Sequence, residues 1–285
     1  MSAPLLGAIR RGAAGFSGTI GVWAWRLPAG PQVALSADEP FETASAIKTL
    51  ILAAAMRRVA AGQDDLAAPL LVRPEHFVRG SGVLRELSDG ITLRLRDVLT
   101  LMVAFSDNIA TNMVIDRVGG VAAVNAEAAR QGMARTRLLA RLDFASGAND
   151  NGVGVSTPRE MGELYLRLYR GACVDPQADA TMREILLRQQ STLAISRYLP
   201  YALLSPPEGS GRQPLLRIAS KSGSWEGSRV DCGILYGPAG DYVVSLWSKG
   251  CADLRFHPDN EALLLLARVS RVLWDAWGGT GPAHA

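Results

Sequence analysis

Segments rich in β-forming residues lie near both ends of this 285-residue chain and bracket a long helical middle. Residues 16–26 alternate as a strand does, and 31–36 fit the second strand of a hairpin. Three further β-like runs come late, at 215–220, 230–236 and 242–248, with a Gly-Pro-Ala-Gly turn between the last two. This order predicts one antiparallel sheet with strands from both ends of the chain and a helical segment inserted between them.

Helical patterns fill the middle of the chain and flank the strands. Residues 3–12 are amphipathic, and a helix expected over 43–60 is apolar on nearly all sides, as is typical of a central buried helix. Asp259 or Asn260 is the expected cap of a last helix that ends near Trp277. We therefore predict an α/β plus all-α fold, in which an antiparallel sheet is flanked by terminal helices and carries an inserted helical domain.

The domain boundaries that we expect follow from these patterns. A discontinuous sheet domain takes 1–42 and 205–285, the all-helical domain takes 43–204, and the active site is expected at their interface. The segment 205–213, rich in Pro and Gly, is the expected linker. The loop 143–156 is dense in turn residues and interrupts the helical middle.

Composition argues for a globular chain and against several kinds of partner. Hydrophobic residues make up 48% and charged residues 20% of the chain, which is enough for a substantial core. The net charge of +3 is too small to suggest a nucleic-acid or membrane partner, and the longest apolar run, 50–56, is far short of a membrane span. No signal peptide is recognisable, which predicts a cytoplasmic protein if Met1 is the native start and a periplasmic one otherwise.

Two of the three lysines in this arginine-rich chain stand in short serine-containing clusters. These are Ser45-Ala46-Ile47-Lys48 and Lys221-Ser222-Gly223, and a third cluster, Ser106-Asp107-Asn108, lies between them. A buried lysine can lose its proton and act as a base, whereas arginine stays charged. A genome rich in arginine codons would explain the shortage of lysine, but not the positions of the lysines that remain.

The first cluster fits a nucleophile with its base. Thr43 is expected to cap the buried helix, which puts Ser45 in the first turn, where unpaired N–H groups and the helix dipole would stabilise an oxyanion. Lys48 lies three residues further on and shares that face, so burial would let it take the Ser45 proton. The S-x-x-K spacing alone arises by chance about once in a few hundred residues and is weak by itself.

The second cluster fits proton transfer and substrate positioning. Ser106 could relay a proton between Lys221 and a leaving nitrogen, and Asn108 could hold Lys48 and a substrate amide. The alternative for this cluster is a plain helix N-cap, since Ser and Asp are common caps.

The third cluster fits the binding of an anionic substrate. Lys221 would be a fixed positive charge, Ser222 a donor to a substrate carboxylate, and Gly223 a point of close backbone approach. The Ser224 N–H could form an oxyanion hole with that of the nucleophile, and Arg229 is a candidate bidentate anchor for a carboxylate. The alternative is a surface turn after a strand.

In this order the three clusters are the signature of class A β-lactamases and penicillin-binding proteins, and over about 7–277 the chain resembles the class A serine β-lactamases. The stretches 41–45 and 88–112 look like that family's nucleophile turn, helix and following loop. The resemblance implies a small-molecule substrate, either a β-lactam or a related amide or ester with a carboxylate, and an acyl-enzyme on Ser45. The residues that it implicates, in the roles given above, are Lys48, Ser106, Asn108, Lys221, Ser222 and Arg229.

Two features depart from that family. Its hydrolytic members carry Glu-x-x-Leu-Asn in a loop before a Thr-Pro helix start, and this glutamate activates the water that removes the acyl group. The corresponding segment here, about 138–157, holds no glutamate. Its polar candidates are Asp143, Asn149, Asp150 and Asn151, and Asp143 is the best substitute. Trp225 is bulky where the family usually has a small residue. The missing glutamate suggests slow deacylation, and both features suggest a β-lactamase-like serine hydrolase outside the antibiotic-resistance branch.

Other chemistries fit the sequence less well. G-x-S-x-G is absent and the three histidines lie outside the clusters, which argues against a Ser-His-Asp hydrolase. Cys173, Cys232 and Cys251 have no metal-like spacing, so we expect buried free thiols, with one disulfide as the alternative, and no metal or other cofactor. A penicillin-binding or sensor-like protein that stays acylated, a peptidase or esterase, and a degenerate fold remain as alternatives, and the oligomeric state is open.

Overall fold

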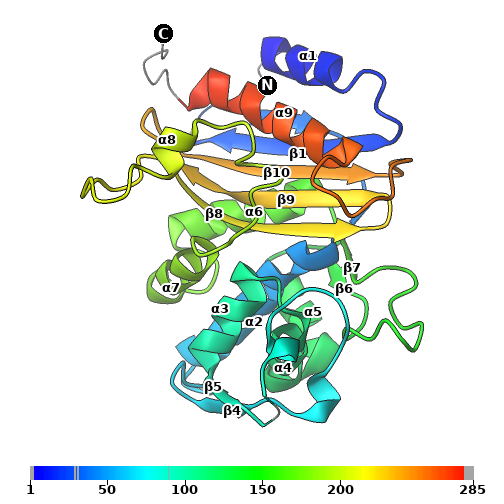
Figure 1. Ribbon diagram of the computed structural model, residues 1–285, viewed down its shortest axis with the longest axis vertical. Coiled ribbons are helices and arrows are strands. Elements are labelled where there is room, and N and C mark those ends of the chain that lie inside the picture. The colour runs from blue at the N-terminus through cyan, green and yellow to red at the C-terminus, as the bar shows by residue number, and fades with distance from the viewer. Residues whose placement is uncertain (1–2, 29, 31, 89, 279–285) are drawn as a thin grey trace.

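A five-stranded antiparallel sheet with strand order β2-β1-β10-β9-β8 lies at the centre of the computed structural model, which describes residues 3–28, 30, 32–88 and 90–278 (Figure 1). Its strands are β1 (Thr19–Arg26), β2 (Gln32–Leu35), β8 (Arg217–Trp225), β9 (Ser228–Tyr236) and β10 (Tyr242–Lys249). The β1–β10 pairing, with Trp23 opposite Ser245, joins strands from the two ends of the chain. The predicted fold class is confirmed.

Helices cover both faces of this sheet. The helices α1 (Ala3–Gly12) and α9 (Glu261–Trp277) lie together on one face, and α6 (Pro158–Arg170) packs on the other (Figure 1). Alternation along β1 explains this arrangement, because Val22 belongs to the core on the α9 side and Trp23 to the core on the α6 side. Helix α6 approaches so closely that a Cβ at Gly162 would lie 2.2 Å from the Trp23 ring.

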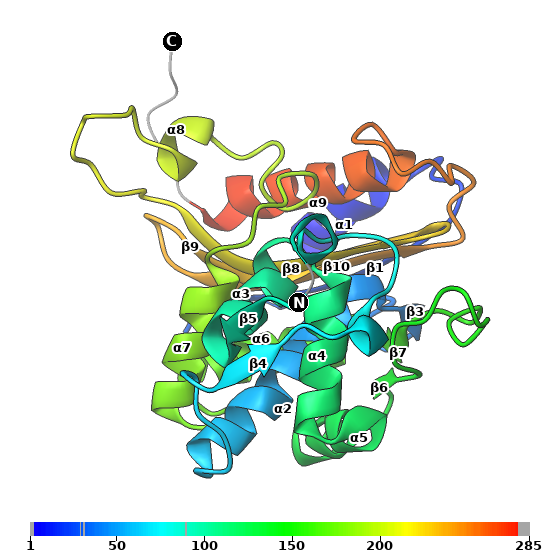
Figure 2. The same cartoon turned by 60° about the horizontal axis from the view of Figure 1, so that its bottom comes forward.

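Five of the remaining helices form a layer beside α6, with α2 at its centre (Figure 2). They are α2 (Lys48–Ala60), α3 (Leu95–Ala104), α4 (Asn108–Val118), α5 (Gly120–Arg130) and α7 (Pro176–Leu186). Two small sheets accompany this layer, one formed by β3 (Phe41–Glu42), β7 (Gly154–Ser156) and β6 (Arg137–Leu138), the other by β4 (Pro69–Leu71) and β5 (Thr92–Arg94). The short α8 (Tyr201–Leu204) lies apart from the layer, on the side of the five-stranded sheet that α9 covers (Figure 1). As predicted, the first nine residues of α2 are all buried.

Two apolar clusters make up the core of the described residues. One fills the helical layer and the adjoining sheet face, and the other lies between the sheet, α1 and α9. Ala194, Ile195 and Leu199 already belong to the second cluster, although they precede the boundary that we expect at 205. The division into two domains stays a prediction.

Several local expectations are corrected. Thr43 does not cap the central helix: its hydroxyl is buried without a hydrogen-bond partner, and a 3₁₀ turn, Ala44–Ile47, precedes α2. The 221–224 cluster lies inside β8, which extends beyond the run expected at 215–220 and excludes the alternative of a surface turn after a strand. Of the two caps expected for α9, Asn260 is the one observed, since its side chain accepts hydrogen bonds from Ala262 N and Leu263 N.

Other expectations hold, or lie beyond what the structure describes. The three cysteines are free and buried, as predicted. No helix among the described residues is both long and apolar enough to span a bilayer. Pro31, expected to begin a strand, and His284, in the terminal tail, lie outside the described residues, as does Asp89 of the stretch 88–112.

Candidate active site

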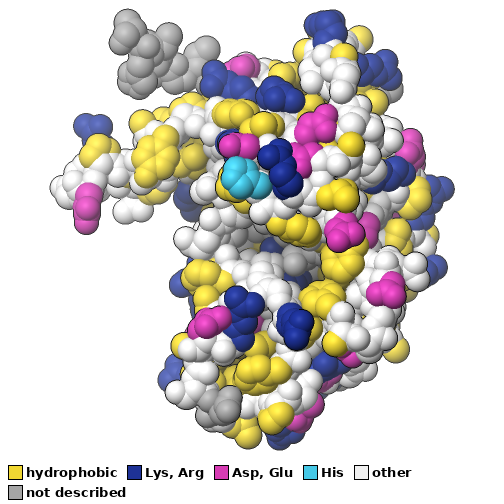
Figure 3. Space-filling view, turned by 45° about the vertical axis from the view of Figure 1, so that its right-hand side comes forward, with side chains coloured by type: hydrophobic (Ala, Val, Ile, Leu, Met, Phe, Trp, Pro, Cys, Tyr) yellow, Lys and Arg dark blue, Asp and Glu magenta, His cyan; other side chains and the backbone are white. Residues whose placement is uncertain are grey.

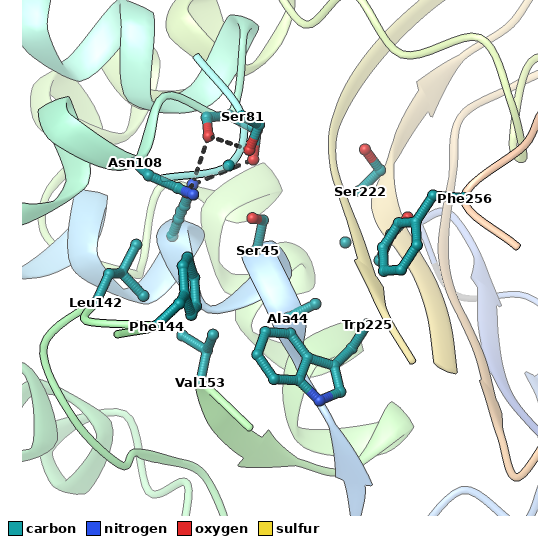
Figure 4. Close-up of a pocket in the computed structure, with 15 residues that line it drawn as sticks. Ala44, Ser45, Ser81, Asn108, Leu142, Phe144, Val153, Ser222, Trp225 and Phe256 are labelled. Atoms are coloured by element: carbon teal, nitrogen blue, oxygen red, sulfur yellow. Dashed lines mark hydrogen bonds between the residues drawn. The ribbon is translucent and has the colours of Figure 1, made fainter. Parts of the chain in front are cut away.

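The three clusters meet at one cavity of about 370 Å³, where the start of α2, the loop between α3 and α4, and the edge strand β8 come together. Figure 3 shows the surface hollowed between the sheet and the helical layer, with hydrophobic side chains around the hollow. The residues expected from the sequence that line it are Ser45, Lys48, Ser106, Asn108, Ser222, Gly223 and Ser224. In Figure 4 the Ser45 side chain stands in the middle of this cavity.

Lys48 is fully buried beneath the cavity and is held by the second cluster. Its Nζ donates to Ser106 O at 2.7 Å, to Asn108 Oδ1 at 2.8 Å and to Ser106 Oγ at 3.2 Å. Burial, together with the charge of Lys221, lowers the Lys48 pKa well below its ordinary value. A neutral amine can donate two of these bonds and accept the third from the Ser106 hydroxyl, so the same geometry suits an unprotonated base.

The nucleophile candidate stands on a strained turn. Ser45 Oγ has no hydrogen-bond partner among the described residues, and Ala44, just before it, has a φ of 43°. Such a conformation costs about 1–3 kcal/mol outside glycine and persists where the surroundings enforce it. Here the Glu42 carboxylate accepts hydrogen bonds from Ala44 N at 2.7 Å and from Val153 N at 2.9 Å, and burial raises its pKa. Glu42 thus ties the nucleophile turn to the loop before β7.

Strand β8 passes this turn at van der Waals distance. A Cβ at Gly223 would lie 2.7 Å from Thr43 O and 2.8 Å from Ser45 N, so only glycine fits. The close approach expected at Gly223 is therefore made to the chain's own nucleophile turn. It brings Ser224 and Ser45 to the same cavity, where their N–H groups remain the predicted oxyanion hole.

The second cluster contains the helix N-cap that was its alternative interpretation, and Asn108 also contacts Lys48 as expected. Asp107 is the N-cap of α4, accepting from Ala110 N at 2.9 Å, and its other oxygen accepts from Val83 N and Leu84 N. Ser106, directly before it, has a φ of 53°. The capping interaction thus fixes the loop that presents Ser106 and Asn108 to Lys48.

Lys221 is buried at one side of this cavity. Its Nζ donates to Ser222 O at 2.7 Å, and it lines a neighbouring recess together with Ser106 and Ser222 rather than the cavity around Ser45. Burial lowers its pKa to about 8, against the opposing effect of Asp231. Lys221 therefore stays mostly charged at neutral pH and loses its charge as the pH rises through about 8. Its role as the positive charge of the site stays a prediction.

Arg229 is buried away from the cavity lining, and its donors are already engaged. The guanidinium donates to the carbonyl oxygens of Trp225, Ser228 and Arg255, and the Phe256 ring covers it at 4.9 Å. Both Trp225 and Phe256 line the cavity. In the structure Arg229 holds the segments that carry Trp225 and Phe256. To bind a substrate carboxylate, its guanidinium would first have to break some of these hydrogen bonds.

The loop candidates for deacylation do not line the cavity. Asp143 is exposed, and its carboxylate accepts from the N–H groups of Ala145 and Ser146. Asn149 is buried, and its Oδ1 accepts from Asp143 N at 2.7 Å. Asn151 is exposed. The expectation that Asp143 substitutes for the missing base is therefore corrected, because its carboxylate binds N–H groups of its own loop and does not line the cavity.

Leu142 occupies the cavity wall that these polar residues were expected to supply. Its backbone is fixed by Asn112, which accepts from Leu142 N at 3.1 Å and donates to Leu142 O at 3.0 Å. Sequence reasoning also missed Ala44, Ser81, Phe144, Val153 and Phe256 as lining residues. Ala44 belongs to the stretch 41–45, whose resemblance to the family's nucleophile turn could have indicated it. The loops have no periodic pattern of hydrophobic residues that would show which side chains point inward.

Comparison with known proteins agrees with this fold. A model described as the β-lactamase enzyme family matches residues 5–277, and the chain belongs to this family. A β-lactamase of Streptomyces cellulosae is 29% identical over 230 residues, which are 79% of this chain and 70% of that protein.

Solved structures give the same result. The crystal structure of a β-lactamase from Sphaerobacter thermophilus matches with a TM-score of 0.84 at 29% identity, over 99% of this chain and 100% of that one. PBP-A matches with a TM-score of 0.82 at 26% identity over 96% of both chains, and a mutant of it was solved as an acyl-enzyme complex with penicillin G. The resemblance inferred from the three clusters is confirmed.

Proposed function

We propose that the chain is a serine hydrolase that opens a β-lactam, or a related amide or ester with a free carboxylate, through an acyl-enzyme on Ser45. Membership of the β-lactamase family supports the reaction class. The burial and contacts of Lys48 support a neutral base beside the nucleophile. In this proposal acylation is faster than deacylation for ordinary penicillins.

The acylation step uses the groups around the cavity in sequence. Neutral Lys48 takes the Ser45 proton, directly or through the Ser106 hydroxyl, while Ser45 Oγ attacks the carbonyl carbon. The oxyanion accepts hydrogen bonds from the N–H groups of Ser45 and Ser224. When the C–N bond breaks, Ser106 passes the proton to the leaving nitrogen, which leaves the acyl group on Ser45.

One observation carries the expectation of slow deacylation. Among the described residues that line the cavity there is no carboxylate, and the loop contributes Leu142 and Phe144 there. Removal of the acyl group needs a water molecule with a base beside it. Lys48 would have to serve both steps, which suits small ester or amide substrates better than a bulky penicilloyl group.

A penicillin-binding protein that stays acylated is the second candidate function. The same lack of a carboxylate favours it, and so does the similarity to PBP-A, a mutant of which was solved as an acyl-enzyme complex with penicillin G. The two functions share the acylation step and differ in the rate at which the product leaves.

Intact-mass spectra recorded over time after mixing with penicillin G, nitrocefin or small esters test the proposal. We expect a burst, a persistent adduct that maps to Ser45, and slow turnover. The Ser45→Ala variant should not be labelled. Undiminished labelling of that variant, or an adduct on Ser106, would contradict the proposed nucleophile.

Recognition of a carboxylate is expected to weaken as the pH rises through about 8, because the buried Lys221 has its pKa lowered to about 8 and is charged only below it. The acylation efficiency of a carboxylate substrate should therefore fall relative to that of its methyl ester. The Lys221→Arg variant keeps its charge and should lose this dependence. Identical pH profiles for acid and ester in the wild type would remove Lys221 from anion binding.

A further inference from the structure

Two aromatic side chains from segments far apart in the sequence meet at the cavity. Phe144 comes from the loop before β7 and Trp225 ends β8, and their ring centroids lie 5.8 Å apart with planes tilted by 46°. Both line the cavity with Ser45 (Figure 4). Phe144 is 37% exposed, so its ring faces the cavity and solvent and is not part of the core.

Hydrogen bonds hold the backbone segment that carries each of the two rings. Arg229 donates to the Trp225 carbonyl from beneath, where it also binds Arg255 O. The backbone at Phe144 is fixed from both sides, because Asn149 accepts from Asp143 N and the Asp143 carboxylate accepts from Ala145 N and Ser146 N. The two rings are therefore presented by fixed segments rather than by free loop ends.

The pair forms part of an apolar wall on one side of the nucleophile. Leu142 and Val153 continue this wall below Ser45, while Ser222 lies on the other side of the cavity (Figure 4). Lys48 is the one ionisable residue among the described residues that line the cavity, and it lies beneath Ser45 in contact with Ser106 and Asn108. If the carboxylate of a substrate binds toward Ser222, the side chain next to its reacting carbonyl faces the aromatic pair.

We propose that Phe144 and Trp225 determine which side chains this site accepts on the carbon next to the reacting carbonyl. The accepted side chains carry a flat aromatic ring, joined through a short unbranched link to an amide on that carbon. Such a ring can lie against both aromatic residues in the tilted arrangements that aromatic groups prefer. Side chains that are crowded next to their own amide carbonyl are excluded, because they would force the Phe144 and Trp225 rings apart. This inference rests on the proposed function of Ser45.

Penicillins test the inference, because they share the nucleus with the reacting lactam carbonyl and differ only in the acylamino side chain next to it. We would measure the rate of Ser45 acylation by phenylacetyl and dimethoxybenzoyl penicillins. In the wild type the phenylacetyl compound should be favoured by about 10- to 200-fold, the range that an apolar pocket achieves by shape. Trp225→Gly and Phe144→Ala should each reduce this preference by raising the rate for the crowded compound. Phe144→Leu, which keeps an apolar side chain, should reduce the preference less.

The matched control is Phe77→Ala, which removes an aromatic ring that is 42% exposed and lies outside the cavity lining. It should keep the wild-type preference. Labelling of Ser45 with equal preference in the wild type and all variants would overturn the inference and leave the proposed function standing. Failure of every penicillin to label Ser45 would overturn both.

Discussion

Replacement of Lys48 by arginine is expected to slow acylation of Ser45 by about 10²- to 10⁴-fold, the usual contribution of a general base. Lys48 is fully buried, and burial together with the charge of Lys221 lowers its pKa well below the ordinary value, which favours the neutral amine. Arginine keeps its proton at any ordinary pH and cannot accept another from Ser45. Stopped-flow or quenched-flow measurement of adduct formation with a penicillin gives the rate directly.

The pH dependence of the wild-type protein provides an independent check. The neutral amine exists above the lowered Lys48 pKa, so acylation should slow as the pH falls through that value. Lys249→Arg is the matched control, because Lys249 pairs with Glu39 at 3.2 Å outside the cavity lining. If Lys48→Arg retained more than about a tenth of the wild-type acylation rate, Lys48 would have a structural role only.

Replacement of Leu142 by glutamate is expected to accelerate release of the acyl group by about 10²- to 10⁴-fold, because it supplies the missing general base. Leu142 is buried in the cavity wall, and Asn112 fixes its backbone through two hydrogen bonds. A carboxylate at this position would border the space beside Ser45 in which the attacking water must stand. Decay of the penicilloyl adduct, followed by intact mass, measures the effect.

Asp143 provides the matched controls for this substitution. Asp143→Glu enlarges an acidic side chain one position away, outside the cavity lining, and should leave deacylation unchanged. Asp143→Asn should also leave it unchanged. If Asp143→Asn slowed release while Leu142→Glu had no effect, the water would approach from a different side of the acyl group. Thermal unfolding of each variant separates effects on the rate from effects on folding.

Most of the fold was predictable because hydrophobic residues repeat with a different spacing in strands and in helices. This spacing can be recognised within the sequence of a single strand or helix. The alternation along 16–26 and the all-round apolar pattern of α2 led to the observed sheet and central helix. The start of that helix was not predictable in detail. The turn Ala44–Ile47 depends on a positive φ that the Glu42 carboxylate supports through contacts with two segments.

The same distinction applies to the cavity. Ser45, Lys48, Ser106 and Asn108 are brought together as the order of the three clusters led us to expect. The inward position of Leu142 depends on hydrogen bonds to Asn112, thirty residues earlier in the sequence, which no local pattern reveals. The donors of Arg229 likewise go to carbonyl groups of a hairpin and a distant loop, so its residue type alone suggested a free anion site.

The pairing of β1 with β10 also affects how the chain reaches its native state. Thr19 pairs with Lys249, so this ladder closes a loop of more than two hundred residues. Contacts so distant in sequence form slowly, because the entropy of loop closure opposes them until most of the chain is ordered. During synthesis β1 leaves the ribosome long before its partner strand exists, and the cluster on β8 is also made late. We therefore expect the acylation site to assemble after translation of β10, in one of the last steps of folding.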